Sequence, residues 1–127
     1  MKRVNSEIIE GWLDTIDCVI ASKHVYHYCI GITVAPNRRR LTYKNFVPSW
    51  PHYLIIQIGL NQSTALKAEK QIFETLTKGE KASLRYRKYR HDTRDGRYYE
   101  NTGGVNEKNP DYCLYIAWGT KKSYGLE

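Results

Sequence analysis

A nearly uninterrupted apolar run, Tyr-Leu-Ile-Ile-Gln-Ile-Gly at residues 53–59, is the feature that most limits how this chain can fold. A strand with one solvated face alternates apolar and polar side chains, whereas a strand covered on both faces is apolar throughout. We therefore predict a central strand here, with helices on both faces of the sheet. The clearest helix follows from Asn61 to Thr77, with Ser63 as its expected N-cap and Gly79 as its stop.

The other segments predict the remaining elements of a small α/β domain, more strictly of the α+β class. A helix from Ser6 to about Thr15 precedes two strands, Cys18–Ser22 and Val25–Thr33, which we expect to form a β-hairpin. Pro36 suits the first turn of a basic helix that runs to about Asn45, and Tyr112–Trp118 is expected to be a final strand. The expected architecture is a three-stranded mixed or antiparallel sheet with flanking helices, in a single domain of 127 residues.

The C-terminal part is predicted to be a basic extension of this core. Tyrosine alternates with arginine and lysine between Ser83 and His91, Asp95-Gly96 is a hairpin-turn signal, and Arg97–Glu100 supplies the returning strand. We therefore expect a core over residues 17–77, and a basic hairpin with the final strand over residues 78–125.

The charge of the chain favours an anionic partner. Lys and Arg number 20 against 13 Asp and Glu, so the net charge is +7, and basic side chains concentrate between Arg85 and Arg97. Such a field attracts nucleic acid, and cations interleaved with aromatic rings suit phosphates and unstacked bases. The same pattern also arises where charged side chains keep an exposed strand edge from pairing with other molecules.

The expected location is the cytoplasm, with no membrane partner. The sequence has neither a signal peptide nor an apolar run of the roughly 20 residues that cross a bilayer. Cys18, Cys29 and Cys113 form no CxxC pair, and we interpret them as small residues of a reducing compartment. His27 shares a strand face with Cys29, but no further ligands are spaced for zinc.

One specific string follows the predicted hairpin: Tyr28-Cys-Ile-Gly-Ile-Thr33, then Ala-Pro-Asn-Arg-Arg-Arg-Leu41. Together with the order of hairpin, basic helix, buried strand and helix with an internal Glu, it resembles the GIY-YIG endonuclease superfamily, in the branch whose second motif reads Tyr-x-Ile-Gly-Ile-Thr. The resemblance covers about residues 17–77. In that family an Arg eight residues after the motif's Gly reaches the scissile phosphate, which implies that role for Arg39.

The resemblance implies further catalytic residues. Glu69 stands on the helix where the family binds its single divalent metal, so Mg²⁺ or Mn²⁺ is the implied cofactor. Tyr28 matches the tyrosine of the second motif, and Tyr26 is expected on the same strand face because side chains two apart point the same way. Either of them would help to deprotonate water. Tyr43 stands four residues after Arg39, where many members have a His.

Two parts of the family pattern are changed in this chain. The first motif, Gly-Ile-Tyr, falls on Cys18-Val-Ile20, so its tyrosine is missing and another phenol must replace it. The late Asn of the family is assigned to Asn101. The side chains expected to hold nucleic acid are Arg38, Arg40, Arg85, Arg87, Lys88, Arg90 and Asn101.

These features predict a metal-dependent endonuclease that hydrolyses phosphodiester bonds of DNA, or of RNA, as a monomer or a homodimer. The reaction needs charge neutralisation, an activated water and a stabilised leaving oxygen, which Arg39, Glu69 with Mg²⁺ and a tyrosine would supply. Two alternatives stay open: an inactive nucleic-acid-binding module on the same scaffold, which the missing tyrosine favours, and a protein-binding inhibitor or adaptor. Without the resemblance, Arg39 and Glu69 fit ordinary helix surfaces, and Tyr28 and Tyr26 fit ordinary packing positions.

Overall fold

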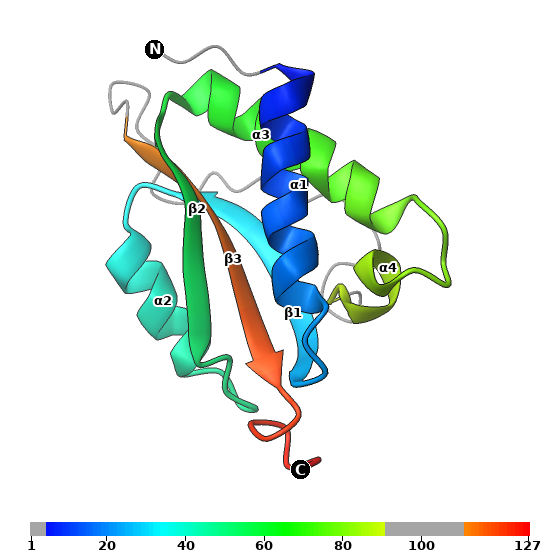
Figure 1. Ribbon diagram of the computed structural model, residues 1–127. Coiled ribbons are helices and arrows are strands. Elements are labelled where there is room, and N and C mark those ends of the chain that lie inside the picture. Colours follow the sequence, from blue (N-terminus) through cyan, green and yellow to red (C-terminus); the bar gives the residue numbers. More distant parts are fainter. Residues whose placement is uncertain (1–4, 91–110) are drawn as a thin grey trace.

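The structure, a computed structural model, describes residues 5–90 and 111–127. Its elements in chain order are α1 (Ser6–Ile20), β1 (Val25–Thr33), α2 (Pro36–Lys44), β2 (His52–Leu60), α3 (Gln62–Thr77), α4 (Leu84–Lys88) and β3 (Tyr112–Thr120) (Figure 1). The strands form one antiparallel sheet in the order β1-β3-β2. The predicted α+β class, a small three-stranded sheet with flanking helices, is confirmed. None of the described helices is both long enough and apolar enough to cross a membrane.

Asparagine side chains cap the two long helices. The side chains of Asn5 and Asn61 each accept a hydrogen bond from the backbone N–H three residues later, at 3.0 Å and 2.8 Å. The predicted cap Ser63 therefore lies within the first turn of α3, as Ser6 does in α1. Serine and asparagine cap helices almost equally well, so residue type alone could not separate the candidates.

Helix α1 continues past its predicted end at Thr15 and includes Cys18–Ile20 as its last turn. Ile16 and Ile20 prolong its apolar face and are buried. The predicted strand at Cys18–Ser22 is therefore wrong, and so is the hairpin that it was to form. The β-branched residues in this stretch indicated a strand. However, Ile16 and Ile20 are four residues apart, which is helical spacing, and both lie on the buried apolar face of α1.

Strand β3 is the centre of the sheet, although it is the last element of the chain. Residues 112–117 are all buried, and both neighbouring strands run antiparallel to it. On one side Gly31 of β1 lies opposite Tyr115, and on the other side Ile55 of β2 does so. Because β3 belongs to the predicted extension, a boundary at residue 77 would cut through the sheet.

Strand β2 forms an edge of the sheet, so the prediction of a central strand at residues 53–59 is wrong. Leu54, Ile55 and Ile58 are 39%, 41% and 65% exposed. The apolar run indicated burial on both faces, but the strand that is buried in this way is β3. The choice between two apolar strands depends on long-range pairing, which local composition does not encode.

The basic segment from Ser83 to His91 was predicted to be the first strand of a hairpin, which is wrong for the residues described. Leu84–Lys88 is helix α4, and the Ser83 hydroxyl caps it by accepting a hydrogen bond from the backbone N–H of Tyr86 (3.3 Å). The helix is followed by a single parallel bridge between Tyr28 and Tyr89. The expected turn and returning strand at residues 95–100 lie outside the described residues.

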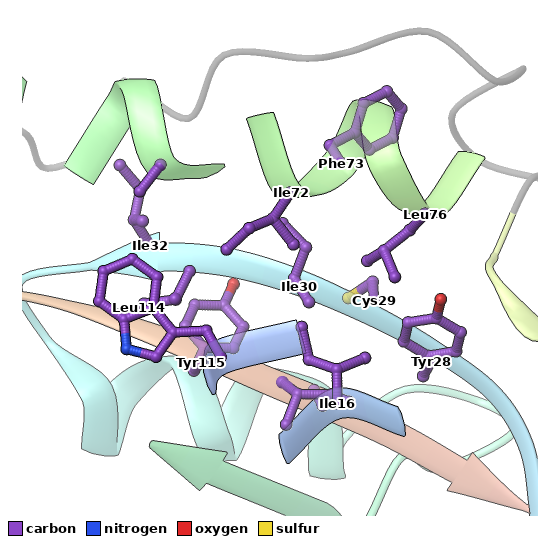
Figure 2. Packing of buried hydrophobic residues seen from close by; sticks show 14 of the residues in the cluster. Ile16, Tyr28, Cys29, Ile30, Ile32, Ile72, Phe73, Leu76, Leu114 and Tyr115 are labelled. Atoms are coloured by element: carbon purple, nitrogen blue, oxygen red, sulfur yellow. The ribbon is translucent and has the colours of Figure 1, made fainter. Parts of the chain in front are cut away.

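The two faces of the sheet are packed differently. On one face, apolar side chains of α1 and α3 meet the even-numbered residues of β1, and Figure 2 shows Ile72 of α3 over Ile30, with Leu76 farther along the helix toward Tyr28. Successive strand residues point to opposite faces. Cys29 and Gly31 consequently face the other way, toward α2.

Gly31 is required by the close approach of Tyr115. A Cβ atom at position 31 would lie 2.6 Å from Cζ of the Tyr115 ring and closer still to its Oη atom. Since the two residues are opposite each other in the register, the tyrosine ring extends across the glycine backbone. This packing fixes the path of the Tyr115 side chain toward β1.

The Gly31→Ala substitution should lower the free energy of unfolding by about 1–3 kcal/mol, because the added methyl group overpacks the Tyr115 ring. Gly11→Ala in α1 is the matched control: nothing lies within 4 Å of its Cβ position, so helix propensity should raise stability by about 1 kcal/mol. Urea denaturation of the two variants measures both changes. Equal effects of the same sign would contradict the packing described.

Candidate functional site

The face of the sheet under α2 carries tyrosines where the opposite face carries aliphatic side chains. Tyr43 comes from α2, Tyr53 from β2 and Tyr115 from β3; we call these three residues the tyrosine cluster. The rings of Tyr53 and Tyr115 stack with centroids 4.8 Å apart, and the Tyr43 ring meets Tyr115 edge-on at 5.8 Å. Three elements distant in sequence therefore converge on one aromatic layer.

A chain of hydrogen bonds orients the phenols. The Cys29 thiol donates to Oη of Tyr43 (3.3 Å), and the hydroxyls of Tyr43 and Tyr115 are 2.9 Å apart. Each hydroxyl has only one hydrogen. Because Tyr43 accepts from the thiol, its own hydrogen is available to Tyr115, and the Tyr115 hydrogen is then available to a further acceptor.

Burial controls the ionisation of the cluster. Desolvation, the largest effect on each side chain, raises the pKa of Tyr43, Tyr53 and Tyr115 above the ordinary value of 10.0. The three phenols are thus protonated at neutral pH. In this state each can donate a hydrogen bond but none can act as a base.

Arg39 and Glu69 are carried by two different helices, α2 and α3. Of three consecutive arginines on α2, Arg39 is half-buried whereas Arg38 and Arg40 are exposed. After burial, which is the largest effect, the Arg39 guanidinium lowers and the Glu69 carboxylate raises the pKa of Tyr115. The two charged groups that the sequence singled out therefore both affect the pKa of one phenol, which the sequence analysis did not identify.

Glu69 is a buried carboxylate with 1% of its surface exposed. An ionised carboxylate is costly to bury unless a cation or hydrogen bonds compensate it. A carboxylate is a hard-oxygen donor, which fits Mg²⁺ or Mn²⁺ better than softer metals. The part of the chain that the structure describes holds no group of three or more His, Cys, Asp or Glu side chains for a metal, so an ion at Glu69 would also need oxygens from substrate or water.

Tyr28 is not part of this arrangement. Its side chain is fully buried on the opposite face of the sheet, its hydroxyl donates to the carbonyl oxygen of Arg85 (2.7 Å), and its ring meets Tyr89 edge-on at 5.2 Å. The structure does not bring it to Arg39 or Glu69. In β1 it is Cys29 that faces the cluster, because the alternation of the strand places neighbours on opposite faces.

Tyr26 is also away from the cluster. A β-bulge between Val25 and His27 interrupts the strand alternation, and the half-buried Tyr26 ring lies 4.8 Å from the ring of Tyr124. The expectation that Tyr26 and Tyr28 act from one regular strand face did not allow for this bulge. Such irregularities depend on the partner strand and leave little trace in the sequence.

Arg85 and Lys88, two of the side chains predicted to contact nucleic acid, instead hold α4 against the end of α1. Arg85 donates two hydrogen bonds to the Asp17 carboxylate, at 2.8 Å and 2.7 Å. Nζ of Lys88 donates to the carbonyl oxygens of Ile20 and Ser22, at 2.7 Å and 2.9 Å, and so satisfies acceptors at the end of α1. These contacts give both side chains a structural role.

The other predicted contacts differ in accessibility. The Arg90 guanidinium lies 5.0 Å from the ring centroids of both Phe46 and Trp50. The backbone N–H of Arg90 donates a hydrogen bond to the carbonyl oxygen of Tyr28 (3.0 Å). Asn101 lies outside the described residues. The exposed members of the predicted set are Arg38, Arg40 and Arg87.

Sequence reasoning missed Tyr115 and Tyr53. We expected the phenol that replaces the missing first-motif tyrosine to lie on β1, next to the second motif. Tyr115 is identified only by the pairing of β3 with β1, which places it opposite Gly31. The glycine was the available signal, since a glycine inside a strand often marks the close approach of another group.

No family model matches the sequence, and no match is found among curated proteins or solved structures. The chemistry of the site is therefore inferred from its own residues and contacts.

Alkaline pH should destabilise the fold through the tyrosine cluster. Because the pKa of each phenol is raised in the folded state, the folded chain holds these protons more tightly than the unfolded chain. Their contribution to stability is complete below pH 10 and is lost as the pH rises above 10. Urea midpoints should accordingly fall above pH 10, and less steeply in Tyr115→Phe. An identical fall in this variant and in wild type would contradict the burial of that hydroxyl.

Proposed function

We propose that this chain is a metal-dependent endonuclease of the GIY-YIG type that hydrolyses DNA phosphodiester bonds in the cytoplasm. The observation that carries the proposal is the hydrogen-bonded pair of Tyr43 and Tyr115 on the face under α2, the helix that also carries the half-buried Arg39. A guanidinium, a carboxylate and a protonated phenol provide a phosphoryl clamp, a metal ligand and a hydrogen-bond donor.

Arg39 and Tyr115 would act on the phosphoryl group. The planar guanidinium can donate to two phosphoryl oxygens at once, which a lysine cannot do. The Tyr115 hydroxyl, oriented by Tyr43, would donate to an oxygen on which negative charge develops as water attacks phosphorus and the bond to the leaving oxygen breaks. Its role is thus that of a donor, and not that of the base expected of Tyr28 or Tyr26.

Glu69 would hold Mg²⁺ or Mn²⁺ together with oxygens of the substrate. When bound, such an ion supplies neutralising charge at the phosphoryl group and acidifies a water molecule. A single carboxylate makes a weak site in the free protein. We therefore expect metal affinity to rise when nucleic acid is present.

The sheet topology departs from the family order, because the first-motif residues Cys18–Ile20 lie in helix α1 and not in a strand beside β1. In the family, the strand with the first motif pairs with the strand that ends at the glycine of the second motif. In this chain the partner of β1 is β3, and Tyr115 of β3 extends across Gly31. We assign the role of the missing first-motif tyrosine to Tyr115, supplied from the C-terminal strand.

One observation favours the inactive nucleic-acid-binding module as a second candidate. Tyr115 and Glu69 are each 1% exposed, so a phosphodiester reaches them only after neighbouring side chains have moved. The exposed arginines Arg38, Arg40 and Arg87 could bind nucleic acid without any such movement. Cleavage and binding must therefore be measured separately.

Purified protein should nick supercoiled plasmid in the presence of Mg²⁺ or Mn²⁺. Tyr115→Phe removes one donor to the developing charge and should slow nicking about 100-fold, and Glu69→Gln should abolish metal dependence. Arg39→Lys should reduce cleavage more than DNA affinity. Arg40→Lys, one residue along the same helix but exposed, is the matched control and should cleave normally. Plasmid binding without metal-dependent nicking would support the inactive module.

DNA affinity should fall steeply with salt if the exposed arginines contact phosphates. Replacing Arg38, Arg40 or Arg87 by alanine should each lower the slope of log affinity against log salt by about one. Fluorescence anisotropy with a labelled duplex measures the slope, and circular dichroism verifies that each variant is folded. A folded wild-type chain with no salt-dependent affinity would instead support a protein-binding adaptor.

A further inference from the structure

The outer edge of strand β2 is an open edge of the sheet. Among the described residues β3 is the only strand that pairs with β2, so β2 has no strand along its other side (Figure 1). Three of its apolar side chains, Leu54, Ile55 and Ile58, are exposed. The backbone N–H and C=O groups along such an edge are a template for pairing with a further strand.

The exposed side chains of β2 lie on both faces of the sheet. Leu54 is opposite Ile116 in the register and Ile55 is opposite Tyr115, and residues opposite each other in an antiparallel pair share a face. Leu54 is therefore on the face under α1 and α3, and Ile55 is on the face of the tyrosine cluster. A helix could cover only one of these faces, whereas a strand that joins the edge covers both.

The sequence of β2 carries few of the features that keep exposed edges apart. Edge strands are commonly protected by lysine, by proline or by inward-pointing charges, but residues 52–60 include no Lys, Arg, Asp, Glu or Pro. The register with β3 shifts after Ile55 and again before Leu60, and such irregularities hinder pairing. The regular part of the edge is residues 52–55, and a partner strand is expected to pair there.

The charge of the chain favours a second copy as the occupant of this edge. Each copy carries a net charge of +7, so two copies repel each other over most of their surfaces. Contact through β2 brings no charged side chains of the two strands together. An acidic peptide, in contrast, would find no cation on this strand. Antiparallel pairing about a twofold axis also makes one edge the complement of itself.

We propose that β2 pairs antiparallel with β2 of a second copy, so that two three-stranded sheets join into one sheet of six strands. The twofold axis is then perpendicular to the joined sheet, because antiparallel partners point to the same face. The tyrosine clusters of both copies consequently lie on one side of the dimer. This pairing does not depend on what the candidate site does.

The test compares Leu54→Lys on β2 with Leu84→Lys on α4. The two leucines are 39% and 38% exposed, and both substitutions add the same charge, so the second variant is a matched control. Sedimentation equilibrium of the full chain measures the dissociation constant of the dimer. Leu54→Lys should raise it at least tenfold, because an ammonium group would lose water at the interface, and Leu84→Lys should affect it much less. Circular dichroism verifies that each variant is folded. Equal effects of the two substitutions would overturn the proposal.

Two measurements on the wild-type chain need no substitution. Dimerisation should strengthen as the salt concentration rises, because salt screens the repulsion between like-charged copies, and weakening by salt would show contact through opposite charges and overturn the proposal. Hydrogen exchange of the β2 amides should slow as the protein concentration increases. A monomeric chain whose β2 amides exchange equally at every concentration would overturn the proposal and leave the edge to an extended segment of another protein.

None of these measurements uses nuclease activity. A dimer that does not nick plasmid would refute the endonuclease proposal and still support the pairing of β2. A monomer that nicks plasmid would do the reverse.

Discussion

The ring of Tyr115 across the backbone of Gly31 is the contact on which the candidate site depends. It joins the central strand to its neighbour at a point where any side chain larger than hydrogen would collide with the ring. The Tyr115 hydroxyl is thereby held next to Tyr43, which in turn accepts a hydrogen bond from Cys29. A tight steric fit thus sets the direction of a polar group, and the chemistry proposed for the site follows from that direction.

The two faces of the sheet divide stability and chemistry between them. The face under α1 and α3 is aliphatic and close-packed, as Figure 2 shows for Ile30, Ile72 and Leu76. The face under α2 carries phenols, a thiol and the half-buried Arg39. A dry apolar layer on one side makes the sheet a rigid platform, which lets the other side hold polar groups in a low-dielectric setting where their interactions are strong.

The sequence allowed some parts of this arrangement to be predicted and not others. Arg39 was chosen as a site residue from its spacing to Gly31, and Glu69 from its place on a strongly periodic helix. Both are local features of the sequence, and the roles of the two residues stay predictions. The strand at Cys18–Ser22 failed because its apolar residues continue the buried face of α1, and the central strand at residues 53–59 failed because its position depends on which strands pair. Strand pairing is a long-range property, and here the pairing that matters joins β1 to a strand at the far end of the chain.

The position of β3 has a consequence for how the molecule is made. Among the described residues β1 and β2 do not pair with each other, and β3 is the strand that pairs with both. During synthesis both outer strands leave the ribosome before the middle one, so the sheet cannot assemble until β3 has been made. The rate at which the sheet folds is therefore limited by the closure of long loops.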